Sequence, residues 1–221
     1  MSDERASERV HDRLRRDVLT GVLAPGARVP SERALAVEHG VNRHAVREAL
    51  KRLQQAGLVA ISQGGPTRVH DWERTGGLEV LLDLVDPSDG PVPEHLLRGI
   101  VEMRASIGVD AARRCAQRGS ADVRADVAAR AAACAPRLAA GEDVLDDYAA
   151  LWELVVVGAQ NLAYRLSLNS LVLALATHPE LLALTVPSPD DAPLLVALGR
   201  AVGDGDAEGA SAAARGLLER D

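Results

Sequence analysis

The stretch SERALAVEHGVNRHAVREALKRLQQAGL, residues 31–58, constrains the fold most, because it holds two short helical patterns around a glycine. Ser31 can cap the first helix, since a serine oxygen accepts a hydrogen bond from the free N–H groups of a first turn. Gly40 can take the left-handed conformation that a tight turn requires. Asn42 can cap the second helix, and Gly57 can end it. These signals predict two helices joined by a tight turn.

The two helical patterns separate an apolar face from a basic one. Five apolar residues are spaced to hold the helices and the turn together: Leu35, Val41, Val46, Leu50 and Leu53. Arg43 and Arg47 lie four residues apart and share another face, which Lys51 extends. In a helix-turn-helix the N-terminal half of the second helix enters the major groove, where arginine binds guanine or phosphate. Arginines at this spacing are also common on a solvated helix face, so the flanking elements decide the interpretation.

The flanking elements complete a winged helix-turn-helix. Residues 8–20 show helical spacing, and Gly21, Pro25 and Gly26 break it. LVAISQGGPTRVH, which follows the second helix, has two short β-prone runs around a Gly-Gly-Pro and predicts a hairpin wing. We therefore expect a winged helix-turn-helix DNA-binding domain over residues 1–72.

The remainder of the chain predicts a helical bundle. Residues 73–91 suggest a linker and the first helix of the body, and residues 92–221 form the helical domain for effector binding and dimerisation. The composition is 47% hydrophobic with no Phe, so the core must be aliphatic, which favours helices. Leu162, Leu166 and Leu173 belong to the apolar pattern of one such helix. The expected fold is mainly α: the winged domain with its small β-hairpin, then an all-α bundle of six or seven helices.

Charge is unevenly divided along the chain. Residues 1–75 carry 13 Lys and Arg against 10 Asp and Glu, whereas residues 76–221 carry 12 against 22. A mildly basic head on an acidic body suggests two domains with different partners.

Several other classes are not favoured by the sequence. No GxSxG, phosphate loop or HExxH is present, so we expect no enzyme and no cofactor. Cys115 and Cys134 lack metal or CxxC spacing and are expected to be reduced core thiols. The charged N-terminus predicts no signal peptide, and no apolar run predicts a membrane span. We expect a cytoplasmic protein that is associated with the nucleoid when it binds DNA.

The segment GVLAPGARVPSERALAVEHGVNRHAVREALKRLQQAGLV resembles the DNA-binding head of the GntR family of bacterial transcription regulators, whose pattern it matches as PGxRxPSERxLA…GVxRxxVREALxRLxxxGLV. QGGPTRVHDWERTGGLEVLLDL and DDYAALWELVVVGAQNLAYRLSLNSL are similar to the wing, linker and mid-body helices of its FadR subfamily, the fatty-acid-metabolism regulators. The resemblance implies a homodimer on a double-stranded, palindromic operator.

The resemblance also implies which residues contact DNA. They are Arg33, Asn42, Arg43, His44, Arg47, Gln63 and Gly64. Asn42, His44 and Ala45 stand where the subfamily has threonines, and Gln63 replaces a wing histidine, so the base preference is expected to differ. Ala45 can offer only a methyl contact, for example to thymine.

The body is where the resemblance places an effector. Many GntR bodies bind a metal through one Asp and three His. The corresponding positions here are Tyr148, Trp152, Leu195 and Leu217. These side chains are poor metal ligands, so we expect no metal. The FadR subfamily instead binds long-chain acyl-CoA and then releases DNA.

Three residues are candidates for binding the effector. Arg104 lies beside an apolar stripe, where it needs an anionic partner, either a ligand or neighbours such as Glu102 and Asp110. Tyr148 and Trp152 lie four residues apart, a spacing that also suits core packing. A fatty acyl-CoA is one candidate effector. The alternatives are a regulator of another pathway that senses a small organic acid, and a constitutive DNA binder whose body only dimerises.

Overall fold

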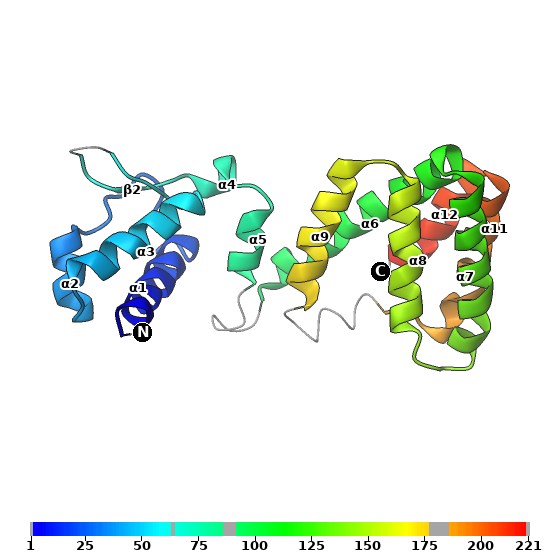
Figure 1. Cartoon of the computed structure of the whole chain (residues 1–221), viewed down its shortest axis with the longest axis horizontal. Coiled ribbons are helices and arrows are strands. Elements are labelled where there is room, and N and C mark those ends of the chain that lie inside the picture. Colours follow the sequence, from blue (N-terminus) through cyan, green and yellow to red (C-terminus); the bar gives the residue numbers. More distant parts are fainter. Residues whose placement is uncertain (1, 63–64, 86–91, 177–185, 220–221) are drawn as a thin grey trace. The chain divides into compact units, whose positions relative to one another are not determined.

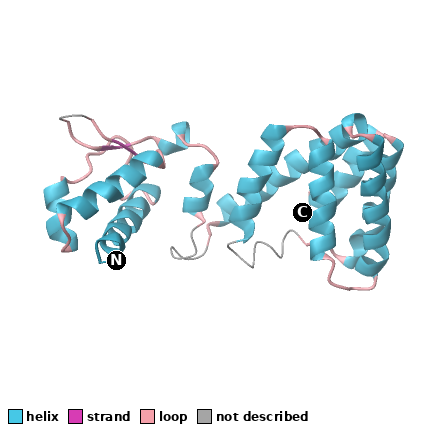
Figure 2. Cartoon of the chain, viewed as in Figure 1, coloured by secondary structure: helices cyan, strands magenta, loops and turns pink. Residues whose placement is uncertain are grey.

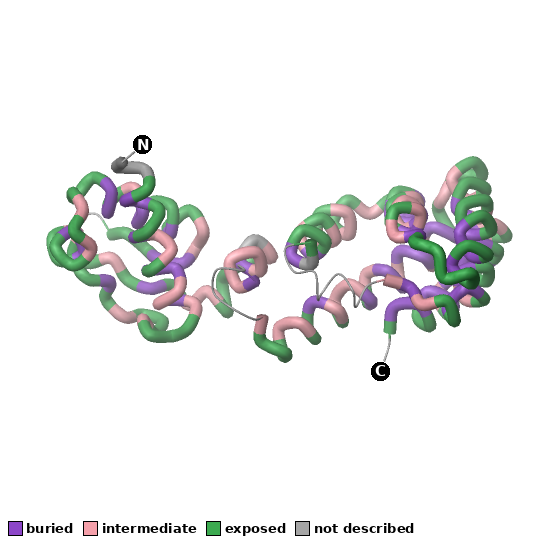
Figure 3. Tube along the Cα trace, turned by 90° about the horizontal axis from the view of Figure 1, so that it is seen from below, coloured by how far each residue is buried: buried purple, intermediate pink, exposed green. Residues whose placement is uncertain are grey.

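The computed structural model describes residues 2–62, 65–85, 92–176 and 186–219. The chain divides into two compact units, Met1–Gly90 and Pro91–Asp221. Figure 2 shows that both are built mainly of helices, as the sequence predicts. In each unit the buried residues gather between the elements, and the exposed residues face outward (Figure 3).

The N-terminal unit contains the expected winged helix-turn-helix. Its elements are α1 (Ser2–Leu19), α2 (Glu32–His39), α3 (Arg43–Gln55), β1 (Val59–Ala60), β2 (Arg68–Val69), α4 (Trp72–Thr75) and α5 (Glu79–Leu84) (Figure 1). Helix α1 packs on α3, and the core between them includes Val10, Leu14, Val46 and Leu53. Helix α1 begins at Ser2, earlier than the expected residue 8.

The caps and the turn are as predicted. The Ser31 side chain accepts a hydrogen bond from the Ala34 backbone N–H at 3.2 Å. Gly40 has a φ of 63°, and Gly57 has a φ of 72°, both in the left-handed region that glycine adopts at low cost. The local signals of the sequence thus set the angle between α2 and α3.

The wing is a two-stranded antiparallel sheet in which Val59 pairs with Val69. A single bridge adds Arg28 opposite Arg68. The expected wing-tip residues, Gln63 and Gly64, lie outside the described residues.

Helix α5 packs with the N-terminal unit, and the contacts group residues up to Gly90 with that unit. The expected division into residues 1–72, 73–91 and 92–221 stays a prediction. Val80 is buried in the core of that unit. The guanidinium of Arg15, only 1% exposed, donates a hydrogen bond to the Asp83 carbonyl. Tertiary contacts that sequence periodicity does not encode thus hold α5 against the head.

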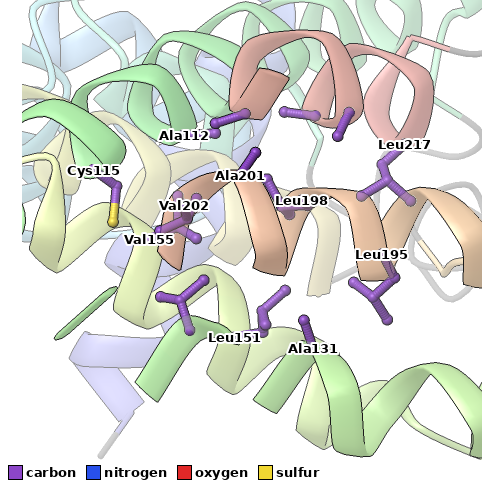
Figure 4. Packing of buried hydrophobic residues seen from close by; sticks show 14 of the residues in the cluster. Ala112, Cys115, Ala131, Leu151, Val155, Leu195, Leu198, Ala201, Val202 and Leu217 are labelled. Atoms are coloured by element: carbon purple, nitrogen blue, oxygen red, sulfur yellow. The ribbon is translucent and has the colours of Figure 1, made fainter. Parts of the chain in front are cut away.

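The second unit is the expected helical bundle. Its described elements are α6 (Glu94–Arg118), α7 (Ala121–Ala139), α8 (Leu145–Gly158), α9 (Leu162–Ala176), the 3-10 helix η2 (Pro189–Asp191), α11 (Ala192–Asp204) and α12 (Ala207–Leu218). The core joins α6, α7, α8, α11 and α12 through alanine, valine and leucine (Figure 4). Cys115 and Cys134 are free and buried, as expected.

The apolar pattern of α9 is not a core face. Leu162, Leu166 and Leu173 are 71%, 59% and 54% exposed. Leu171 and Ala174, which lie on another side of the helix, are the buried residues. Helical spacing identified the helix correctly but did not identify which side is covered, because leucines occur all around it.

Candidate nucleic-acid interface and ligand pocket

Helix α3 separates a buried side from a charged one. Val46, Leu50 and Leu53 are at most 3% exposed. Arg43 and Arg47 are exposed and lie at the N-terminal half of the helix. The apolar contacts therefore fix the orientation of α3 and leave its basic face accessible, as the sequence predicts.

The remaining predicted contact residues divide into accessible and buried ones. Asn42 is exposed, and its Oδ1 accepts a hydrogen bond from the Ala45 N–H at 2.8 Å, so its side chain caps α3. His44 is exposed. Ala45 is 1% exposed, and the expected methyl contact to thymine is therefore wrong. Because a helix needs an apolar residue against the core in every turn, position 45 packs inward.

Two exposed arginines lack a hydrogen bond or an ion pair within the described part of the chain. Arg33 of α2 and Arg43 of α3 are both exposed, and neither forms a hydrogen bond or an ion pair with any residue that the structure describes. Both lie near the N-terminal ends of their helices, where the free N–H groups also favour an anion. This part of the surface is suited to binding phosphate.

Arg47, in contrast, is held by a carboxylate. Its Nε and Nη2 donate to the two oxygens of Glu32 at 3.2 Å and 3.0 Å. This hydrogen bond lowers the pKa of Glu32, against a smaller opposing effect of burial, and Arg43 adds to the lowering. Sequence reasoning missed this pair, because the two residues lie on different helices and only the turn angle brings them together.

The wing adds two arginines that sequence reasoning also missed. Arg28 and Arg68 are exposed and directly opposite each other at the bridge. The Nη1 of Arg68 donates to the Gly26 carbonyl at 2.8 Å, and no carboxylate among the described residues pairs with it. Like charges opposite each other destabilise a sheet, and a bound anion would relieve the repulsion.

The three predicted effector residues meet in one pocket of the helical unit. Arg104 of α6 and Tyr148 and Trp152 of α8 all line a cavity of about 200 Å³. The two rings pack edge to face, with centroids 6.2 Å apart and an angle of 77° between their planes. The sequence left open whether Tyr148 and Trp152 are core residues or ligand contacts, and the structure places both in the wall of a pocket.

The pocket is apolar with few polar groups. Leu168, Val172 and Leu218 contribute aliphatic wall. The indole Nε1 of Trp152 is buried and donates no hydrogen bond to the described residues. Glu153 also lines the pocket, but Arg165 of α9 neutralises it. Convergent polar groups in an apolar cavity are typical of small-molecule sites.

Neither a metal cluster nor a membrane span occurs in the described parts of the chain. No group of three or more His, Cys, Asp or Glu there is placed to hold a metal ion. Of the positions that the metal-binding pattern would use, Leu195 and Leu217 are buried in the aliphatic core. None of the described helices combines the length and the apolar character that crossing a bilayer requires.

Comparison with known proteins identifies the family. Residues 6–69 match the family described as bacterial regulatory proteins, gntR family. The HTH-type transcriptional regulator Mce2R of Mycobacterium tuberculosis is 36% identical over 221 residues, covering 96% of this chain and 88% of that protein. This chain belongs to the GntR family.

Two other similar proteins match this chain over a shorter stretch or at lower sequence identity. The fatty acid metabolism regulator protein of Enterobacter sp. strain 638 is 36% identical over 85 residues, 38% of this chain and 35% of that protein. A solved Streptococcus agalactiae GntR structure covers 96% of this chain and 97% of its own, with 18% identity and a TM-score of 0.48. The protein is a GntR-family helix-turn-helix transcriptional regulator, and members of this family act by binding DNA and not as enzymes.

Proposed function

We propose that this GntR regulator binds a palindromic operator as a homodimer, and that a small molecule bound in the pocket of the helical unit modulates this binding. The DNA-binding surface rests on the exposed arginines at positions 33, 43 and 47. Buried residues on the opposite side of α3 orient Arg43 and Arg47 outward. One recognition helix places only three or four side chains on base edges. Two heads on one duplex are therefore needed for useful specificity.

Selection from a pool of randomised DNA duplexes tests this part of the proposal. The full chain should enrich an inverted repeat whose half-site centres lie about one helical turn apart, or a multiple of it. Light scattering of the complex should give two chains per duplex. Enrichment of a sequence without two-fold symmetry, or no preference over a scrambled duplex, would contradict the proposal.

The chemistry of the pocket supports a ligand with an anionic or hydrogen-bond-accepting end and a short aliphatic body. Arg104 offers a guanidinium and Trp152 an N–H, while Leu168 and Val172 offer apolar contacts. The described walls line a cavity of about 200 Å³, which is small for a ligand pocket. We therefore take a small organic acid as the first candidate effector and a long-chain acyl-CoA as the alternative.

Thermal melting of the full chain distinguishes the candidate effectors. The panel should contain straight-chain carboxylates from four to twelve carbons, small dicarboxylates and palmitoyl-CoA. A ligand that binds only the folded state raises the melting temperature. We expect a selective rise with a small acid, loss of that rise in Arg104→Gln, and release of the selected duplex by the same acid.

A matched control lies on the same helix. Arg98 of α6 is exposed and pairs with Glu94, so Arg98→Gln should respond to the acid as wild type does. A rise with palmitoyl-CoA alone would favour the acyl-CoA alternative. If no compound raised the melting temperature, the constitutive alternative, in which the body only dimerises, would be favoured.

A further inference from the structure

The ion pair between Glu32 and Arg47 joins the two helices of the DNA-binding motif. Glu32 is the first residue of α2, and Arg47 lies 15 residues later, on the exposed side of α3. Two hydrogen bonds connect them, from Nε to Oε1 at 3.2 Å and from Nη2 to Oε2 at 3.0 Å. Two bonds fix the plane of the guanidinium as well as its position.

The geometry leaves a defined part of Arg47 available. A guanidinium has five N–H donors in a rigid plane. Glu32 uses the side edge, formed by Nε and Nη2. The end edge, formed by Nη1 and the second N–H of Nη2, remains for another acceptor. Two parallel donors of this kind match the O6 and N7 of a guanine in the major groove.

Stability does not explain this pair. The side chains of Arg47 and Glu32 are 56% and 37% exposed, and exposed ion pairs contribute little to the free energy of folding. The helix dipole accounts for a carboxylate in the first turn of α2, but it does not account for both oxygens being bonded to α3. A negative charge among arginines also weakens attraction to DNA phosphates.

We propose that Glu32 is a positioning residue that orients the guanidinium of Arg47 toward a guanine, so that it increases sequence discrimination while lowering overall affinity for DNA. The inference rests on the proposed DNA-binding function and adds a residue that does not itself contact the bases. Arginine carries large rotamer entropy, and a side chain that is already ordered loses less of it on binding.

A competing interpretation makes the opposite prediction. If Glu32 only holds Arg47 away from DNA, every duplex must break the pair before binding. Removing the carboxylate would then tighten binding to specific and nonspecific duplexes by the same factor. The ratio of the two affinities therefore separates positioning from competition.

The decisive measurement compares Glu32→Gln with Glu38→Gln, which removes a charge from an exposed residue of the same helix. Binding is measured by fluorescence anisotropy on the selected duplex, on versions with each half-site G·C pair changed to A·T, and on a scrambled duplex. For Glu32→Gln we expect unchanged or tighter binding to the scrambled duplex and a loss of roughly tenfold in discrimination at one G·C position. Glu38→Gln should keep the wild-type ratios.

A double variant tests whether Glu32 acts through Arg47. In the Arg47→Ala background, discrimination at that G·C pair is already lost, so adding Glu32→Gln should change it no further. Unchanged melting of the N-terminal unit in Glu32→Gln would exclude misfolding as the cause.

The possible failures are distinguishable. If wild type does not discriminate between selected and scrambled duplexes, the proposed function is wrong. If wild type discriminates and Glu32→Gln does so equally well, or tightens on every duplex alike, then only the positioning role is overturned.

Discussion

The two units use arginine in different ways. In the helical unit, Arg137 donates to Glu142 and Asp147, and Arg165 donates to Glu153. In the helix-turn-helix, Arg33 and Arg43 are exposed without an ion pair among the described residues. The arginines of the helical unit named here link neighbouring segments, whereas Arg33 and Arg43 are available to an external anion. Arg47 combines both features, because Glu32 holds one edge of its guanidinium and the other edge faces outward.

The two units also differ in how their helices pack. The N-terminal core is made mostly of leucine and valine from α1, α2, α3 and the wing. The helical unit brings helices close together through small residues: a Cβ added at Gly199 of α11 would overlap with Ala131 of α7. Large side chains tolerate small changes of backbone position, whereas close helix approach does not. Substitutions that create cavities should therefore destabilise the N-terminal unit most, and substitutions that add a Cβ should destabilise the helical unit.

The largest expected effect is on the stability of the N-terminal unit alone. Leu53 is fully buried in its core, and Leu→Ala at such sites costs about 2–5 kcal/mol through lost burial and a cavity. Leu53→Ala should lower the urea midpoint of this unit and abolish DNA binding at raised temperature, while the midpoint of the helical unit stays constant. Leu162→Ala, at a position 71% exposed, should change neither midpoint. Equal shifts of both transitions in Leu53→Ala would show that the units unfold together.

The contrast between arginines predicts the next effect. Arg43→Ala should weaken binding to the selected duplex by roughly ten- to a hundredfold, because one contact to a base or a phosphate is lost. Arg165→Ala, which removes a paired arginine of the helical unit, should leave the affinity unchanged. Anisotropy titrations at fixed moderate salt measure both, and Arg52→Ala on the same helix as Arg43 controls for the loss of one charge. If Arg43→Ala, Arg165→Ala and Arg52→Ala all weakened binding to the selected duplex equally, the effect would come from net charge and not from a contact of Arg43.

The parts that the sequence predicted well are those with local causes. Ser31, Gly40 and Asn42 each act within a few residues, through a cap or a left-handed turn, so their roles follow from the chain order alone. The exposed and buried sides of α3 follow from 3.6-residue periodicity in the same way. Arg33 and Arg43 are accessible for the same reason.

The parts that were missed depend on contacts between distant segments. Glu32 meets Arg47 only because of the angle between two helices, and Arg15 meets the Asp83 backbone across 68 residues. The inward position of Ala45 required knowing where the core lies. The pocket combines residues from Arg104 to Leu218, so the sequence suggested candidates but not their juxtaposition.

Close packing in the helical unit gives a smaller and directly testable effect. Gly199→Ala must push α11 away from α7, and overpacking of this kind costs about 1–3 kcal/mol. Gly99 of α6 has no atom within 4 Å of an added Cβ, so Gly99→Ala should stabilise the same unit by about 0.5–1 kcal/mol. Urea unfolding of the helical unit measures both changes. Stabilisation by both substitutions would mean that α7 and α11 are not tightly packed at this point.

The smallest expected effect concerns a carboxylate that links α6 to α9. Burial raises the pKa of Asp110, but hydrogen bonds from Tyr164, Arg114 and Arg113 outweigh it and hold the pKa well below its ordinary value of 3.8. The stabilisation is therefore fully present above the unfolded pKa and is lost as the pH falls toward the folded one. For this partly exposed carboxylate we expect Asp110→Asn to lower the free energy of unfolding by about 0.5–1 kcal/mol at pH 7.

This difference between wild type and Asp110→Asn should shrink as the pH falls below about 4, because the wild-type carboxylate then loses its advantage over the amide. Urea unfolding of the helical unit from pH 3 to pH 7 measures it, with Asp126→Asn, an exposed residue of α7, as the control. A difference that stays constant down to pH 3 would mean that the hydrogen bonds, and not the charge, hold α9 to α6. In that case Arg113 and Arg114 would hold this contact through the geometry of their N–H groups, and their positive charges would add little to it.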